Sequence, residues 1–238
     1  MLKKFLLNLF FPQFCLGCGK EGSLICKDCL SLIEISEYQY CPFCNPPKRV
    51  FDGRNCPTHQ RMKLNGLFAA TSYQNSLVKK LITSFKYEPF LKTLKGPLAF
   101  LIIAHFLLSE NKIIQEEPEN SLLIPIPLSS FKRRWRGFNQ SEEIAQELST
   151  FFKIPLFYGL IKIKKTQPQV ELKREERIKN IQGAFKVREP AKIRRKRIFL
   201  VDDVFTTGST MEEAARVLKI AGAREVWGIV VAREILSD

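Results

Sequence analysis

Two adjacent carboxylates near the C-terminal end are the residues best suited to chemistry. Asp202 and Asp203 come directly after the apolar run 198–201, and a short turn follows them. Neighbouring carboxylates can accept hydrogen bonds from two hydroxyls of a sugar and can share a divalent cation. This combination predicts a pocket for a sugar that carries an anionic group. The turn contributes hydroxyls and one glycine, at Thr206, Thr207, Gly208, Ser209 and Thr210.

A buried strand and a helix must position these groups. Residues 198–201 have the apolar character of a central parallel strand, and residues 211–221 have the spacing of a helix. The backbone N–H groups at a helix start, together with the helix dipole, favour a phosphate, and Gly208 lets the backbone approach it closely. The alternative is a buried strand with a polar loop that binds nothing.

The whole segment resembles the 5-phosphoribosyl-1-diphosphate (PRPP) motif of type I phosphoribosyltransferases. An apolar strand, Asp-Asp and Thr-Thr-Gly-x-Thr match that motif together and in register. The resemblance implies that Asp202 and Asp203 are the catalytic pair and hold the ribose hydroxyls, directly or through Mg²⁺. It also implies that residues 206–210 hold the 5-phosphate and that diphosphate is lost through an oxocarbenium-like state.

A cationic segment follows a second predicted strand, at 122–128. We expect residues 129–140 to form a loop there, and the loop at this place in type I phosphoribosyltransferases grips diphosphate. Arginine forks suit diphosphate oxygens and would stabilise the charge that develops as the anomeric bond breaks. The alternative is a solvated loop. The diphosphate candidates are Ser129, Lys132, Arg133, Arg134 and Arg136.

The seven cysteines predict metal binding. They and one histidine form four pairs, each separated by two residues, which is the spacing that gives two ligands to one tetrahedral ion. Disulfides are disfavoured because the number is odd, and an iron–sulfur cluster is the remaining rival. Two structural zinc sites are expected, with sequential pairing favoured over interleaved pairing. The eight ligands are Cys15, Cys18, Cys26, Cys29, Cys41, Cys44, Cys56 and His59.

Strands alternate with helices after this metal-binding part, which favours an α/β fold with a mostly parallel sheet. We expect a double zinc ribbon at 1–63 and a phosphoribosyltransferase-like domain at 64–238. The predicted strands are 67–73, 122–128, 156–163, 198–201 and 225–232, and the predicted helices are 76–85, 91–108, 140–152, 174–180 and 211–221.

Hydropathy and charge limit the function classes. No apolar stretch reaches the roughly 18 residues that span a bilayer, so no stable membrane insertion is expected. Residues 1–11 imitate a signal peptide but have no cleavage site, so we expect a short amphipathic helix and a cytoplasmic protein. The net charge is +14, and residues 131–197 hold 19 Lys and Arg against 7 Asp and Glu. Such a surplus favours polyanions, the alternative being a scattered solvated surface.

Aromatic residues beside these cations are suited to stacking on unpaired bases. Phe131, Trp135 and Phe138 interleave with the cations at 132–136, although each is also a plausible core residue. The nucleic-acid candidates are Arg134, Trp135, Arg136, Lys164, Lys165 and Arg177.

The chain as a whole resembles the ComF family (ComF and GntX-like proteins), with a match over residues 5–235. Two departures are His59 in place of a last cysteine and Lys165 in place of an arginine. The motifs that carry the resemblance are the double zinc ribbon, Phe-Lys-Tyr at 85–87, Pro-Ile-Pro at 125–127, Arg-Gly-Phe-Asn-Gln at 136–140, Thr-x2-Gln at 166–169, Arg-x2-Asn at 177–180 and Gly-Ala-Phe at 183–185.

This resemblance implies a role in natural competence, with handling of incoming single-stranded DNA and, in some bacteria, a helicase partner. Residues 155–190 would form the hood and flexible loop that choose the acceptor. A Mg²⁺-dependent phosphoribosyltransferase is therefore expected. The alternatives are a non-catalytic protein that binds single-stranded DNA and a salvage enzyme for a free base.

Overall fold

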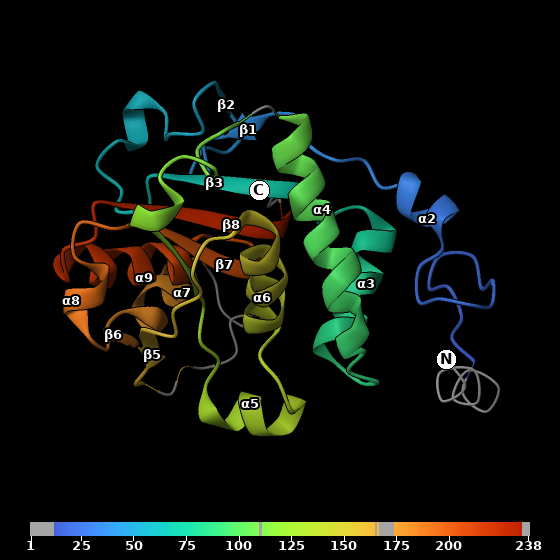
Figure 1. Cartoon of the computed structure of the whole chain (residues 1–238). Coiled ribbons are helices and arrows are strands. Elements are labelled where there is room, and N and C mark those ends of the chain that lie inside the picture. Colours follow the sequence, from blue (N-terminus) through green and yellow to red (C-terminus); the bar gives the residue numbers. More distant parts are fainter. Residues whose placement is uncertain (1–11, 110, 165, 167–173, 235–238) are drawn as a thin grey trace.

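A four-stranded parallel sheet forms the centre of the molecule (Figure 1). The computed structural model of the chain describes residues 12–109, 111–164, 166 and 174–234. The strands lie in the order β3 (Gly66–Ser72), β8 (Glu225–Arg233), β7 (Arg197–Phe205) and β4 (Ser121–Pro125). A single parallel bridge between Leu123 and Leu156 extends the β4 edge. In such a sheet, all the carboxyl ends of the strands lie along one edge, where ligands usually bind.

Helices cover both faces of this sheet and close two hydrophobic cores. One core lies under α3 (Ser76–Lys86), α4 (Lys95–Leu108) and α6 (Gln140–Phe152). The other lies under α9 (Ser209–Ile220) and α8 (Pro190–Ile193). Because both faces are covered, β7 and β8 are almost continuously buried, as their unbroken apolar runs predict. The predicted type I phosphoribosyltransferase fold, with a parallel sheet between helices, is confirmed.

The predicted strand at 156–163 is wrong as a single element. The chain makes one bridge at Leu156, leaves the sheet, and forms the separate strand β5 (Leu160–Lys162). That strand pairs antiparallel with β6 (Phe185–Val187), and α7 (Arg174–Ile181) lies between them in sequence. An apolar run has no feature that separates one long strand from two short segments, which explains the error. The predicted helix at 91–108 is likewise a short η2 turn (Lys92–Leu94) followed by α4.

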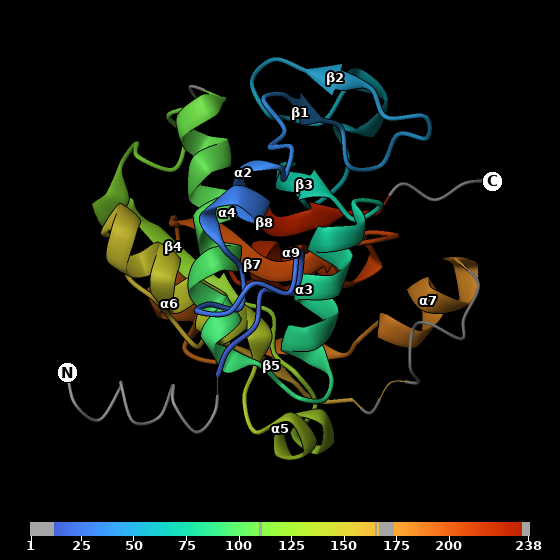
Figure 2. The ribbon, with the colours of Figure 1, turned by 90° about the vertical axis from the view of Figure 1, so that its right-hand side faces the viewer.

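The cysteine-rich part of the chain contacts the rest of the molecule at two places (Figures 1 and 2). Its first half, with α2 (Lys27–Ser31), packs beside α3 and α4. Its second half, with β1 (Gln39–Tyr40), β2 (Arg49–Val50) and η1 (Pro57–His59), lies beyond the β3 edge. The helix expected at 1–11 lies outside the described residues. The domain boundary expected at residue 63 stays a prediction.

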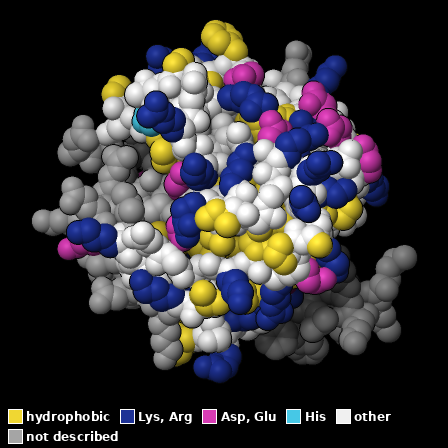
Figure 3. Space-filling view, turned by 90° about the vertical axis from the view of Figure 1, so that its left-hand side faces the viewer, with side chains coloured by type: hydrophobic (Ala, Val, Ile, Leu, Met, Phe, Trp, Pro, Cys, Tyr) yellow, Lys and Arg dark blue, Asp and Glu magenta, His cyan; other side chains and the backbone are white. Residues whose placement is uncertain are grey.

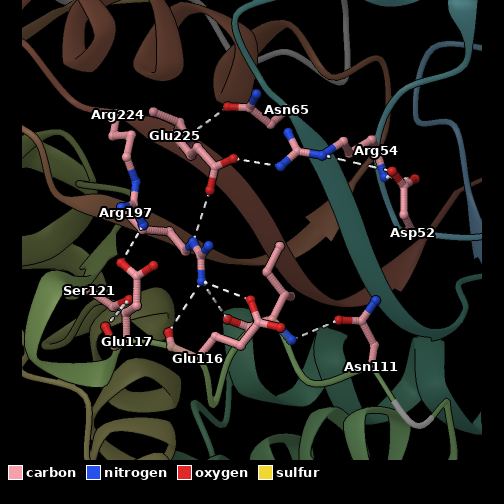
Figure 4. A network of polar contacts seen from close by, with 12 residues as sticks. Asp52, Arg54, Asn65, Asn111, Glu116, Glu117, Ser121, Arg197, Arg224 and Glu225 are labelled. Carbon is pink, nitrogen blue, oxygen red and sulfur yellow. Dashed lines mark hydrogen bonds and ion pairs between the residues drawn. The ribbon is translucent and has the colours of Figure 1, made fainter.

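An ion-pair network fixes the amino end of the sheet (Figure 4). Glu225, the first residue of β8, accepts from Arg197 Nε at 2.9 Å and from Arg54 Nη2 at 2.6 Å. Arg197 also donates to the carbonyls of Ile113 and Glu116, at 3.1 and 3.2 Å. Burial alone would raise the pKa of Glu225, but the two guanidinium groups outweigh it and lower this pKa to about 2. The network therefore ties the cysteine-rich part to the sheet at the end opposite Asp202 and Asp203.

The basic surplus of 131–197 is divided among several elements. It begins on α5 (Ser130–Arg136), continues through β5, α7 and α8, and ends at the buried Arg197. On the face drawn in Figure 3, Lys and Arg side chains are spread widely among apolar and acidic ones. No helix among the described residues is both long enough and apolar enough to cross a membrane.

Candidate functional site

The two aspartates lie within β7 and not after its end. This strand runs to Phe205 and stays paired with β8 up to the partners Phe205 and Arg233. The predicted strand end at Val201 is therefore wrong, because pairing with β8 continues past the last residue of the apolar run. The consequence is that a hydrogen-bonded ladder, and not a loop, holds both carboxylates at the carboxyl edge of the sheet.

Asp203 forms a buried ion pair with Lys86, the last residue of α3. The Lys86 Nζ lies 2.7 Å from Asp203 Oδ1, and the two side chains are only 20% and 8% exposed. Burial alone would lower the pKa of Lys86, but the attraction of Asp203 outweighs it and raises this pKa. Lys86 therefore keeps its positive charge beside Asp203.

Asp202 has weaker support for its charge. Its Oδ1 accepts from Ser141 Oγ and from the Asp203 backbone N–H, both at 2.9 Å. Burial, together with the neighbouring Asp203, raises the pKa of Asp202 to about 7, and Lys86 only partly opposes this. A cation or a pair of sugar hydroxyls brought to this carboxylate would stabilise its charged form.

Asn139 positions the serine that contacts Asp202. Its side chain caps α6, where Oδ1 accepts from the Ser141 backbone N–H at 3.2 Å. The amide nitrogen of the same side chain donates to the Ile126 carbonyl at 3.0 Å, just past the end of β4. The loop after β4 and the start of α6 are thereby locked to the carboxylate pair on β7.

The hydroxyl-rich turn follows β7 directly and leads into α9. Gly208 is the N-cap of this helix, with φ +78°, a conformation that favours glycine. A Cβ on Gly208 would lie 2.5 Å from the Phe205 ring, so there is no room for a side chain. Thr207 Oγ1 and Ser209 Oγ lie 3.0 Å apart. The turn thus gathers hydroxyls at the start of a twelve-residue helix, which suits a phosphate.

The segment after β4 contains a helix, so the predicted loop is wrong there. Helix α5 (Ser130–Arg136) begins after Ser129, whose Oγ accepts from the Lys132 backbone N–H at 3.3 Å. It ends at Gly137, which has φ +76°. A serine N-cap and a glycine at the C-terminal end are the two local signals in the sequence that predict this helix.

The four cations on α5 have different environments. Arg133 donates to both carboxylate oxygens of Glu142, at 2.9 and 3.0 Å. Arg136 is buried, donates to Gln140 Oε1 and lies over Tyr87. Arg134 is exposed.

Lys132 is a half-buried cation of α5 whose charge is close enough to Asp203 to be influenced by it. Burial, together with the positive charges of Arg136 and Lys86, lowers the pKa of Lys132, while Asp203 opposes the shift. Sequence reasoning could not choose among the four cations, because the choice depends on which side chain of α5 points toward β7.

A third lysine was missed in the sequence. Lys162 on β5 donates to Thr166 Oγ1 at 2.7 Å. Burial, then repulsion by Lys132, lowers its pKa to about 8, and Asp202 opposes this. Lys86 was also missed, although the segment that contains it was noted. Lys86, Lys132 and Lys162 come from three separate elements, so no spacing in the sequence groups them around Asp202 and Asp203.

The aromatic residues of α5 are divided between surface and core. Trp135 is 50% exposed and Phe131 is 69% exposed, whereas Phe138 is buried. Trp135 packs edge-on against Phe90, and the Arg136 guanidinium lies 5.9 Å from its ring centroid. Of the other nucleic-acid candidates, Lys164 is exposed. Lys165 and the side chain of Arg177 lie outside the described residues.

Two groups of four ligands meet in space, in the sequential order. The first contains Cys15, Cys18, Cys26 and Cys29, and the second contains Cys41, Cys44, Cys56 and His59. The donor atoms of each group lie within 4.8 Å of one another, and the described cysteines are all free of disulfides. The Cys18–Cys26 and Cys44–Cys56 sulfur distances are 3.7 and 3.5 Å. A tetrahedral ion with metal–sulfur bonds of about 2.3 Å needs about 3.8 Å, so both groups could hold a metal ion.

Comparisons with known proteins agree with this geometry. The family model "Phosphoribosyl transferase domain" matches residues 136–235. "Competence protein F" of Haemophilus influenzae is 28% identical over 94% of this chain and 99% of its own. "Competence protein ComFC" of Bacillus subtilis is 26% identical over 84% and 79%, respectively. "DNA utilization protein YhgH" of Salmonella typhi is 31% identical over 63% and 70%.

Proposed function

The chain belongs to the ComF family of competence-related proteins with a phosphoribosyltransferase-like domain, and from this premise we propose that it binds PRPP with Mg²⁺. The observation that carries the proposal is the juxtaposition of the Asp202–Asp203 pair with the turn at 206–210 on one sheet edge. The pair would hold the ribose hydroxyls and the cation. The turn would hold the 5-phosphate at the start of α9.

The proposed reaction is transfer of the phosphoribosyl group. The bond between C1 and the diphosphate oxygen breaks, the diphosphate leaves with the electron pair, and a nucleophile attacks C1. Mg²⁺, when bound, would neutralise charge on the departing diphosphate. Of the predicted diphosphate contacts, Lys132 is supported by its electrostatic interaction with Asp203. Ser129, Arg133, Arg134 and Arg136 remain candidates for that role.

Positioning and electrostatics would carry this chemistry. Lys86 would keep Asp203 charged and fixed, so that Asp203 can accept from a ribose hydroxyl without moving. Lys162 lies on β5, in the segment 155–190 that we expect to form the hood. It would add positive charge on the side where an acceptor enters. Asp202 would lose its proton as sugar hydroxyls or the cation bind, because both favour its charged form.

Calorimetry with PRPP and Mg²⁺ tests the proposal. The wild type should bind PRPP with micromolar affinity, and the Asp202→Ala/Asp203→Ala double variant should lose binding at least 100-fold. Glu189→Gln, an exposed carboxylate on the same domain, is the matched control and should bind as the wild type does. Absence of PRPP binding by the wild type would refute the proposal, whatever the fold.

A second function, binding of single-stranded DNA, is favoured by the exposed rings of Phe131 and Trp135 beside the α5 cations. Stacking contributes about 1–3 kcal/mol per base, so Trp135→Ala should weaken binding roughly 5–150-fold. Phe100→Ala, which removes a similarly exposed ring on α4, is the control. If the double aspartate variant still binds DNA and the wild type does not bind PRPP, the chain is a non-catalytic protein that binds single-stranded DNA. PRPP consumption with one free base and no DNA binding would favour a salvage enzyme.

The remaining parts of the proposal concern metals and partners. We propose that Zn²⁺ occupies both cysteine groups, because sulfur and imidazole in closed four-ligand sites suit that ion. A cytoplasmic location and a helicase partner also stay predictions. Co-purification of tagged chain from competent cells tests the helicase.

A further inference from the structure

The second cysteine group lies against the turn at 206–210, the candidate phosphate site. Phe43 is one of the two residues between Cys41 and Cys44, and its ring packs edge-on to Phe205 with centroids 6.4 Å apart. The same ring lies 5.8 Å from the His59 ring. A Cβ on Gly208 would come within 3.2 Å of Phe43 Cε1. One aromatic side chain therefore contacts both a predicted metal ligand and the turn that would hold the 5-phosphate.

Two polar contacts join the same parts of the chain. Arg233, at the end of β8, donates to the carbonyls of Pro42 and Cys44 at 3.1 and 3.2 Å. Glu212, in the first turn of α9, accepts from the backbone N–H groups of Lys63 and Leu64 at 2.7 and 2.9 Å. The knuckle before Cys44 and the segment after His59 are thus both attached to elements that border the turn.

The first cysteine group has no such connection within the described residues. Cys15 and Cys29 belong to the core under α3 and α4, on the other face of the sheet. Leu16 and Gly17 stand in the first knuckle where Pro42 and Phe43 stand in the second, and Leu16 packs against that same core. The chain therefore contains an internal control, namely a second metal group of similar make-up that lies away from the turn.

We propose that the ion of the second cysteine group and the 5-phosphate of PRPP stabilise each other's binding, with Phe43 as the positioning residue between them. This inference rests on the proposed function. Without the ion, four ligands and the knuckle lose their fixed arrangement. Phe43 would then no longer hold Phe205 and Gly208 in the conformation that leaves space for the phosphate. Thermodynamic linkage requires the effect to be equal in both directions.

Equilibrium competition with a zinc chelator tests the proposal on the full-length chain loaded with two Zn²⁺. Saturating PRPP with Mg²⁺ should raise the Zn²⁺ affinity of the second cysteine group about tenfold. It should leave the Zn²⁺ affinity of the first cysteine group unchanged. Calorimetry should show the same factor, as an affinity for PRPP that is about tenfold weaker after removal of the ion of the second cysteine group. Cys18→Ser, which weakens only the first group, identifies which site responds.

Variants separate coupling from general damage. Phe43→Ala should lose about tenfold in PRPP affinity and abolish the effect of PRPP on Zn²⁺ affinity, whereas Leu16→Ala should change neither. If Phe43→Ala unfolds, Phe43→Leu replaces it, because leucine keeps an apolar contact. The PRPP affinity of Phe43→Leu should be weaker than that of the wild type by less than the tenfold expected for alanine. The inference is wrong if the wild type binds PRPP and neither Zn²⁺ affinity responds to it. Failure of the wild type to bind PRPP would overturn the proposed function, and the inference with it.

Discussion

Replacing Asp202 by asparagine should stabilise the ligand-free protein at pH 8, although it removes a carboxylate from the candidate site. Burial and the neighbouring Asp203 raise the pKa of Asp202 from 3.8 to about 7. The folded protein therefore keeps a proton there over a pH range in which the unfolded chain has released it. Because the folded state binds more protons, stability falls as the pH rises from about 4 to about 7 and stays lower above that.

The magnitude follows from the size of this shift. Each pKa unit corresponds to about 1.4 kcal/mol, so the two units between pH 5 and the pKa of Asp202 correspond to roughly 3 kcal/mol. The attraction of Lys86 is already part of the pKa of about 7, so we expect a measured change of about 3 kcal/mol. In Asp202→Asn the amide oxygen can still accept from Ser141, and no proton equilibrium remains at this position.

Urea unfolding at pH 5 and pH 8, without PRPP or Mg²⁺, measures the effect. The difference in unfolding free energy between Asp202→Asn and wild type should grow by about 3 kcal/mol from pH 5 to pH 8. Comparing the two proteins at each pH cancels the titration of the cysteine ligands. Asp203→Asn is the comparison variant. It leaves the Lys86 ammonium without its partner and should cost about 3 kcal/mol at pH 5, and less at pH 8, because the neighbouring charge that raises the pKa of Asp202 is gone. A difference for Asp202→Asn that is the same at both pH values would refute the reasoning.

Three further predictions concern stability and metal content. Glu225→Gln should cost about 2 kcal/mol of unfolding free energy at pH 7. The depressed pKa of Glu225 contributes stability above pH 4.5, and this stability is lost as the pH falls toward 2. The midpoint of urea unfolding should therefore depend less on pH in the variant than in the wild type. Asn139→Ala should cost about 2 kcal/mol, since it removes the cap of α6 and leaves the Ile126 carbonyl unpaired. Asn75→Ala removes only the cap of α3 and is the control. The difference between the two variants in thermal unfolding measures the stability that the Ile126 hydrogen bond contributes. Chelation should release two Zn²⁺ per chain and loosen the part before β3; hydrogen exchange that stays unchanged there after metal removal would contradict this.

Much of the fold was predictable because its signals are local. The buried runs of β7 and β8, the periodicity of α3 and α6, and the paired cysteines each depend on residues close in sequence. The errors also have local causes. Helix α5 was not predicted because a short run rich in cations is also typical of a solvated loop. The end of β7 was misplaced because ladder pairing with β8 continues beyond the apolar residues.

The candidate site was predictable only where one segment supplies it. Asp202, Asp203 and the turn at 206–210 are contiguous, and their relation to one another follows from a strand that leads into a helix. Lys86 and Lys162 come from α3 and β5, so only tertiary packing brings them to the carboxylates. The link between Phe43 and Gly208 is of the same kind, because 165 positions separate the two residues in the sequence.

The place of β3 in the sheet has a consequence for biosynthesis. This strand is the first of the sheet to leave the ribosome, yet its sheet neighbour is the last strand, β8, with Gly66 opposite Trp227. At about 5–20 residues per second, β3 waits roughly 10–30 s for that partner. During that time its apolar residues lack their final cover, and such an edge invites pairing with other chains. The sheet is therefore completed only when β8 is available, and nascent chains that end before residue 225 are the species most prone to aggregate.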